Sequence, residues 1–115
     1  MDTAQRAHEL ASAFAEGIDA IVRVRERRGA PHLAHEVDLQ AVGKALSHMK
    51  TALETMVASA EAGEGWTSLR VNDELMQRIE AVLAYLPTIA PGAPLPDAFF
   101  DRVDLAWTEI ERAMG

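Results

Sequence analysis

Residues 39–60, LQAVGKALSHMKTALETMVASA, carry the most regular apolar pattern in the chain. Apolar side chains recur there at alternating spacings of three and four residues, at Leu39, Val42, Leu46, Met49, Leu53, Met56 and Ala60. This is a heptad pattern, with leucine at the a positions and valine or methionine at the d positions. Such a pattern predicts a long helix that buries one face against other helices.

Signals on both sides of this stretch suggest its limits. Pro31 is a favourable first residue for a helix, and the glycines of AGEGW (62–66) are typical of a helix end. We therefore predict a helix over about residues 32–62. Extended backwards from Leu39, the heptad register then places His35 at a d position and His32 at an a position.

Three further helices are predicted, over about residues 3–28, 72–86 and 96–114. The first has an apolar stripe and ends in an arginine-rich turn followed by Gly29, and the third is closed by Pro87. Residues 87–96 contain four prolines and form the crossover to the last helix. The stripe of the first helix comprises Ala7, Ala11, Phe14, Ile18 and Ile21, and Leu10, Val22 and Val24 widen it. The inward face of the last helix comprises Phe99, Phe100, Val103, Trp107, Ile110 and Met114.

These elements predict an all-α fold and a single domain over residues 1–115. Four amphipathic helices joined by short connections favour an antiparallel, up-and-down four-helix arrangement. At a rise of about 1.5 Å per residue, the first two helices should be about 39 and 46 Å long and the last two only about 22 and 28 Å. The sequence thus predicts a long helical hairpin that two shorter helices cover in part.

The uncovered part should be the end of this hairpin that contains the turn RRGAPH (27–32). We expect that end to expose apolar side chains, and monomers seldom leave such a patch in water. The sequence therefore predicts a homodimer, or the docking of a helix from another protein, at this end of the hairpin. The predicted interface residues are Ile18, Ile21, Val24, Leu33, Val37, Leu39 and Val42.

Composition limits the function. The 115-residue chain has no cysteine and a net charge of −7, all of it in residues 32–115, because residues 1–31 hold five arginines and five acids. This acidic balance disfavours binding to nucleic acid or to anionic membranes. No apolar run is long enough to span a bilayer and the N-terminus does not resemble a secretory signal, so we expect a cytoplasmic protein.

The histidines allow two interpretations. His32 and His35 share one face of the predicted second helix, and with Glu36 they could hold zinc or a similar ion. The alternative is that both histidines are polar residues at the end of the heptad pattern, where the packed face of the helix begins. His48 could accept a phosphoryl group, but the lysine and glycine that usually follow such a histidine on a helical bundle are absent from SHMKT (47–51).

The arginines at 23, 25, 27 and 28 compensate the dipole of the first helix, and they could also pair with the acidic last helix of another subunit. No nucleophile–base pair, phosphate-binding loop or HExxH motif is present. The favoured function is therefore a non-enzymatic protein–protein interaction module without a cofactor, such as an adaptor, chaperone-like protein or regulatory subunit. The alternative is a small metal- or ligand-binding bundle that uses His32, His35 and Glu36.

Overall fold

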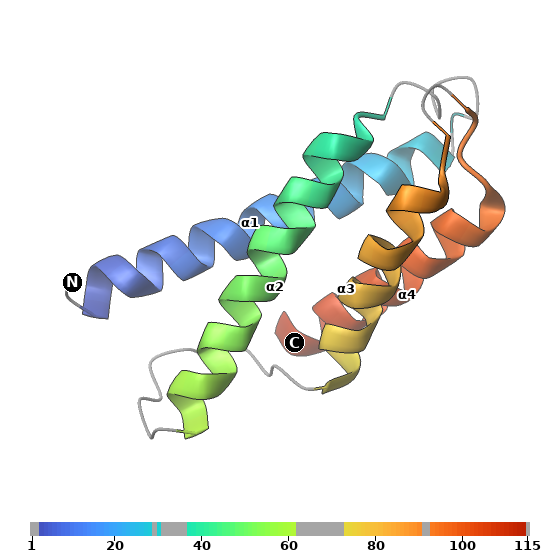
Figure 1. Cartoon of the computed structure of the whole chain (residues 1–115). Coiled ribbons are helices and arrows are strands. Elements are labelled where there is room, and N and C mark those ends of the chain that lie inside the picture. The colour runs from blue at the N-terminus through green and yellow to red at the C-terminus, as the bar shows by residue number, and fades with distance from the viewer. Residues whose placement is uncertain (1–2, 29, 31–36, 62–72, 91–92, 115) are drawn as a thin grey trace.

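The chain is all-helical over the residues that the computed structural model describes, which are 3–28, 30, 37–61, 73–90 and 93–114. The elements in these ranges are α1 (Thr3–Arg28), α2 (Leu39–Glu61), α3 (Asp73–Tyr85), the short 3₁₀ helix η2 (Leu86–Thr88) and α4 (Asp97–Met114) (Figure 1). None of these helices has the combination of length and apolarity that a membrane-spanning segment requires.

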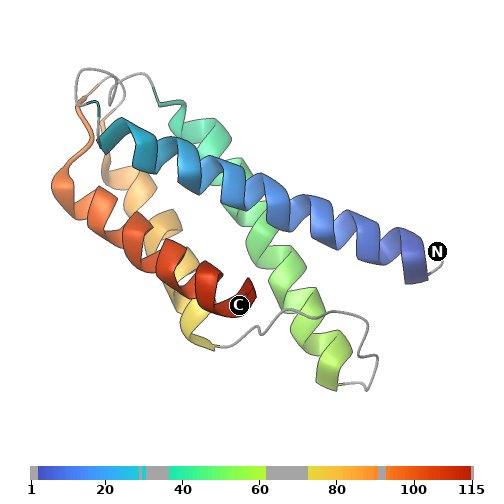
Figure 2. The same ribbon diagram turned by 180° about the vertical axis from the view of Figure 1, so that it is seen from behind.

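Each α-helix packs against two others. α1 contacts α2 and α4, and α3 contacts α4 and α2, so the apolar core lies between the α1–α2 pair and the α3–α4 pair. The N-terminal end of α1 and the C-terminal end of α2 extend away from α3 and α4 in both views (Figures 1 and 2). The two shorter helices therefore cover the C-terminal half of α1 and leave its first turns uncovered.

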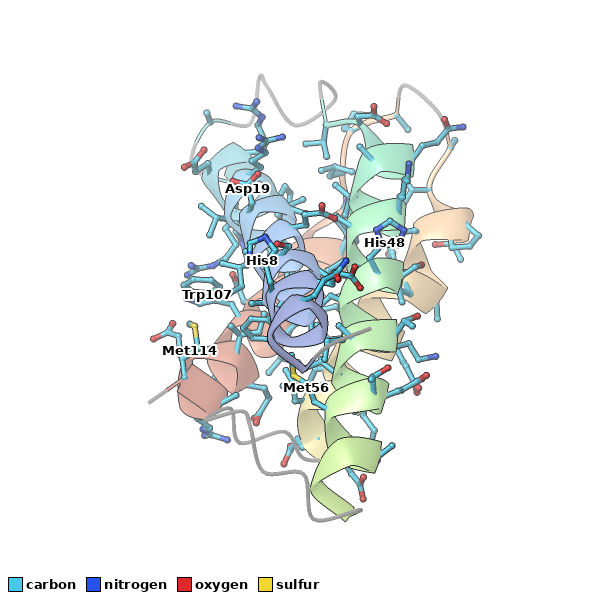
Figure 3. The ribbon with its side chains drawn as sticks, turned by 90° about the vertical axis from the view of Figure 1, so that its left-hand side faces the viewer. His8, Asp19, His48, Met56, Trp107 and Met114 are labelled. Carbon is cyan, nitrogen blue, oxygen red and sulfur yellow. The ribbon has the colours of Figure 1, made fainter. Side chains whose placement is uncertain are left out.

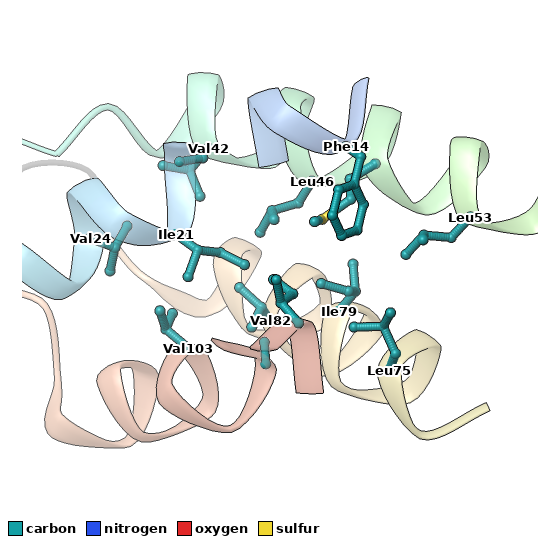
Figure 4. Packing of buried hydrophobic residues seen from close by; sticks show 14 of the residues in the cluster. Phe14, Ile21, Val24, Val42, Leu46, Leu53, Leu75, Ile79, Val82 and Val103 are labelled. Atoms are coloured by element: carbon teal, nitrogen blue, oxygen red, sulfur yellow. The ribbon is translucent and has the colours of Figure 1, made fainter. Parts of the chain in front are cut away.

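The heptad predicted for α2 is confirmed. Val42, Leu46, Met49, Leu53 and Met56 are all buried, and Leu39 is half-buried at the start of the helix. Figure 4 shows three of these side chains facing residues of α1, α3 and α4 across the core. The heptad face of α2 is therefore part of the core that the four helices share.

The buried face of α1 agrees with most of the predicted stripe. Leu10, Phe14, Ile21 and Val24 are buried, but the prediction for Ala11 is wrong, because it is exposed. The buried positions repeat every three or four residues once Gly17, also buried, is counted with them. A Cβ atom at Gly17 would lie only 2.7 Å from the Cβ of Met49, so α1 and α2 approach closely at this glycine.

The predicted start of the second helix is wrong. Val37 and Asp38 are not helical, and α2 begins at Leu39. The Asp38 side chain accepts a hydrogen bond from the backbone N–H of Ala41 at 3.1 Å, and its backbone carbonyl accepts one from Val42 at 3.0 Å. Asp38 is thus the N-cap, and it satisfies backbone donors that the first helical turn leaves without partners.

The start of α4 agrees with the prediction, because the Pro96 carbonyl accepts the backbone N–H of Phe99 at 3.0 Å. On the inward face of this helix Phe99, Phe100, Val103 and Ile110 are buried and Trp107 is half-buried. The prediction for Met114 is wrong: its side chain is 51% exposed, and in the last turn of α4 it is Ala113 that faces the core.

Candidate functional site

The residues predicted to bind a metal, His32, His35 and Glu36, lie outside the described part of the chain. The predicted helix does not reach these residues as one continuous element, because α2 begins at Leu39 and the two residues before it, Val37 and Asp38, are not helical. Over residues 3–28, 37–61, 73–90 and 93–114, no three histidine or carboxylate side chains are grouped closely enough to hold an ion.

The predicted interface is mostly inside the protein's own core. Ile21, Val24 and Val42 are buried, and Ile18, Val37 and Leu39 are half-buried and pack against the same core. Leu33 lies outside the described residues. The expectation that these residues would be exposed is therefore wrong for the first three.

Two findings explain this error. α2 has 23 residues instead of the expected 31 or so, and this shortens the α1–α2 pair. In addition, Ile89 and Leu95 of the crossover are buried in the core, and the first turns of α4 lie against the C-terminal turns of α1. The end that was expected to be bare is thus the end that α4 and the crossover cover.

A network of arginine and aspartate side chains fastens α1 to α4. Arg25 Nε donates to Asp104 Oδ1 at 3.1 Å, and Arg28 donates to Asp101 Oδ1 at 2.8 Å and also to Asp104. The same guanidinium groups lie over aromatic rings of α4, Arg25 over Trp107 at 4.9 Å and Arg28 over Phe100 at 5.7 Å. The predicted pairing of these arginines with an acidic α4 is therefore observed, but within one chain.

The charge of Arg28 is reinforced by this network. Its hydrogen bond to Asp101 raises the pKa of the guanidinium, partial desolvation opposes that rise, and the charges of Asp101 and Asp104 add to it. Arg28 therefore carries its positive charge within the network.

We expect Asp104→Asn to lower the free energy of unfolding by about 1 kcal/mol, because Asp104 joins both arginines but all three side chains are partly exposed and screened by solvent. Glu111→Gln is the matched control on α4, since Glu111 is exposed and has no ion-pair partner among the described residues. Urea unfolding measures both variants. Equal effects of the two substitutions would show that the network does not hold α1 to α4.

A second feature is an open groove between α1 and α2, on the side away from α3 and α4. We call it the charged groove; its volume is about 540 Å³. Figure 3 views the molecule from this side, with Asp19 of α1 and His48 of α2 labelled. The lining residues are Glu16, Asp19, Ala20, Arg23, Arg27, Val37, Asp38, Ala41, Val42, Lys44, Ala45 and His48.

The charged side chains of this groove are only partly paired. Arg23 contacts Asp19 at 2.9 Å along α1, and His48 Nδ1 lies 3.5 Å from Glu16 across the groove. The Nε of Arg27 is buried without a hydrogen-bond partner. Lys44 has no carboxylate partner among the described residues. The groove thus presents charges of both signs whose interactions within the chain are incomplete.

Sequence reasoning did not identify this groove. Glu16, Asp19 and Lys44 were not singled out, because a single charge at a helical position most often indicates only a solvated surface. The spacing of Glu16, Asp19, Arg23 and Arg27, by three and then four residues, was the available signal, since it places all four on one face of α1.

Comparison with models of protein families, with curated proteins and with solved structures gave no match for this chain.

Proposed function

We propose that this protein is a non-enzymatic interaction module that binds another polypeptide in the charged groove between α1 and α2. The proposal includes an antiparallel, up-and-down order of the four helices and action in the cytoplasm. The contacts between successive helices support that order. An adaptor or regulatory subunit with such a groove works by holding a partner helix.

The observation that carries the proposal is the composition of the groove. Three alanines, Ala20, Ala41 and Ala45, line it together with charged residues of both signs. Small side chains allow the axis of an approaching helix to come close, because the distance between packed helices depends on the side chains at their contact. The acidic and basic side chains that line the groove then set the register and orientation of the partner helix.

The charges favour a polypeptide over other ligands. Sites for small molecules are mostly apolar with a few convergent polar groups, whereas half of the residues that line this groove are acids, arginines or lysine. The groove also contains three carboxylates, those of Glu16, Asp19 and Asp38, which would repel a phosphate backbone. A partner helix with charges of both signs can pair with both the acids and the cations of the groove.

A photo-crosslinking amino acid at Ala41 tests the proposal in cells that produce the protein. Ala41 is exposed in the groove, and Ala98, exposed at the start of α4, is the matched control. We expect an adduct with a polypeptide at position 41, its loss when Arg23→Glu and Arg27→Glu are added, and none at position 98. Absence of an adduct at 41, or an adduct that persists after both charge reversals, would contradict the proposal.

A further inference from the structure

The four charged residues that α1 contributes to the groove are ordered along the helix. Glu16 and Asp19 come first and Arg23 and Arg27 follow, so the stripe is acidic toward the N-terminus of α1 and basic toward its C-terminus. Ala20, the only other α1 residue that lines the groove, lies between the two halves. A surface with this order complements its own copy when the copy runs in the opposite direction.

We propose that the partner in the charged groove is a second copy of this chain, with the two α1 helices antiparallel across a two-fold axis next to Ile21. This inference rests on the proposed function of the groove. In this register Glu16 faces Arg27 of the other copy and Asp19 faces Arg23. Each pairing places the two-fold axis at a point along α1, and the two points differ by less than the rise of one residue. The two-fold symmetry repeats each pair, which gives four intermolecular ion pairs.

The charge balance of the whole chain favours this face for self-association. Two copies that each carry a net charge of −7 repel one another. The charged groove is balanced, because Glu16, Asp19 and Asp38 stand against Arg23, Arg27 and Lys44. The surplus of acidic over basic side chains therefore lies elsewhere on the chain. Two copies that meet at the groove do not bring those acidic side chains together.

The ion pairs that these side chains form within one chain do not prevent them from pairing with a second copy. Arg23 and Asp19, which pair along α1, are 71% and 60% exposed, and His48 and Glu16 are also more than half exposed. Exposed pairs of this kind are held weakly, so their members are free to change partner. Arg27 has no carboxylate partner among the described residues, and it gains one from Glu16 of the second copy.

Complementary charge reversal tests the register. One variant carries Glu16→Arg and Asp19→Arg, which makes the stripe wholly basic, and the other carries Arg23→Glu and Arg27→Glu, which makes it wholly acidic. Arginine and glutamate both favour helices, so α1 should form in each variant. The control reverses the exposed pair on α3 instead, with Glu74→Arg and Arg78→Glu.

Sedimentation equilibrium of the full-length chain at tens of micromolar gives the readout. We expect a wild-type dimer, a rise in the dimer Kd of about tenfold or more in each reversed variant, and recovery when the two variants are mixed. The control should dimerise like the wild type, and added salt should weaken the dimer.

A monomeric wild type, a dimer unaffected by reversal, or folded variants that fail to associate when mixed would overturn the inference. If the crosslinker at Ala41 captures a different polypeptide while the wild type is monomeric, the groove binds proteins but the partner is not a second copy. The two proposals are therefore tested separately.

Discussion

Phe99→Ala is expected to lower the free energy of unfolding by about 3–5 kcal/mol. Phe99 is the largest fully buried side chain among the described residues, and its ring centroid lies 5.9 Å from that of Tyr85 and 6.2 Å from that of Phe100. Truncation removes these contacts and leaves a cavity, because the structure around a buried side chain relaxes only in part. A domain of this size has about 5–15 kcal/mol in total, so much of its stability would be lost.

Leu105→Ala is the matched control, since Leu105 lies on the same helix but is 46% exposed. A change within about 0.5 kcal/mol is expected there. Urea unfolding followed by circular dichroism measures both variants. A loss at position 99 no larger than that at position 105 would show that α4 does not pack on the core through Phe99.

Gly17→Ala should also destabilise the protein, by about 2 kcal/mol, although alanine favours helices more than glycine. The new methyl group would lie 2.7 Å from the Cβ and 2.9 Å from the Cγ of Met49. The Cβ of Met49 is fixed to the backbone of α2, so no change of rotamer relieves that overlap. α1 and α2 must separate, and Phe14 and Leu46 on either side would lose contacts in the core.

Gly43→Ala provides the control on α2, because a Cβ there would meet only Leu86 Cδ1 at an acceptable 3.4 Å. Helix propensity then dominates, and we expect stabilisation by about 0.5–1 kcal/mol. Thermal unfolding of the two alanine variants should thus shift in opposite directions. A stabilising effect at position 17 would refute the close approach of α1 and α2.

The sequence predicted the parts of the fold that depend on local pattern. Met49 and Leu53 were assigned to the seam of α2 from spacing alone, because burial along a helix follows its period. The face of α1 was harder to identify, because Gly17 occupies a seam position without an apolar side chain. Its role depends on the distance between two helices, which no local pattern contains.

The start of α2 shows a second limit. Pro31 and Asp38 are both good signals for the start of a helix, and the sequence alone does not decide between them. The choice of Pro31 added about eight residues to the predicted helix, and the register of His32 and His35 was extrapolated through Val37 and Asp38, which are not helical. That error in length also led to the expectation of an exposed end.

The candidate site depends on contacts that are distant in sequence. Arg28 and Asp101 are 73 residues apart, so their pairing follows from the tertiary arrangement and not from either segment. The charged groove has the same origin, since Lys44 and Arg27 line one surface only when α1 and α2 are packed together. The sequence supplied the sign of each charge but not the surface on which it lies.

The pairing of neighbouring helices has a consequence for the order of folding. α1 meets α2, and α3 meets α4, across connections of roughly ten residues, and closing short loops costs little entropy. Helical proteins dominated by such local contacts fold in microseconds to milliseconds. The contact of α1 with α4 instead joins distant parts of the chain. We therefore expect the bonds from Arg28 to Asp101 and Asp104 to form after the two helix pairs, and to join halves that have already assembled.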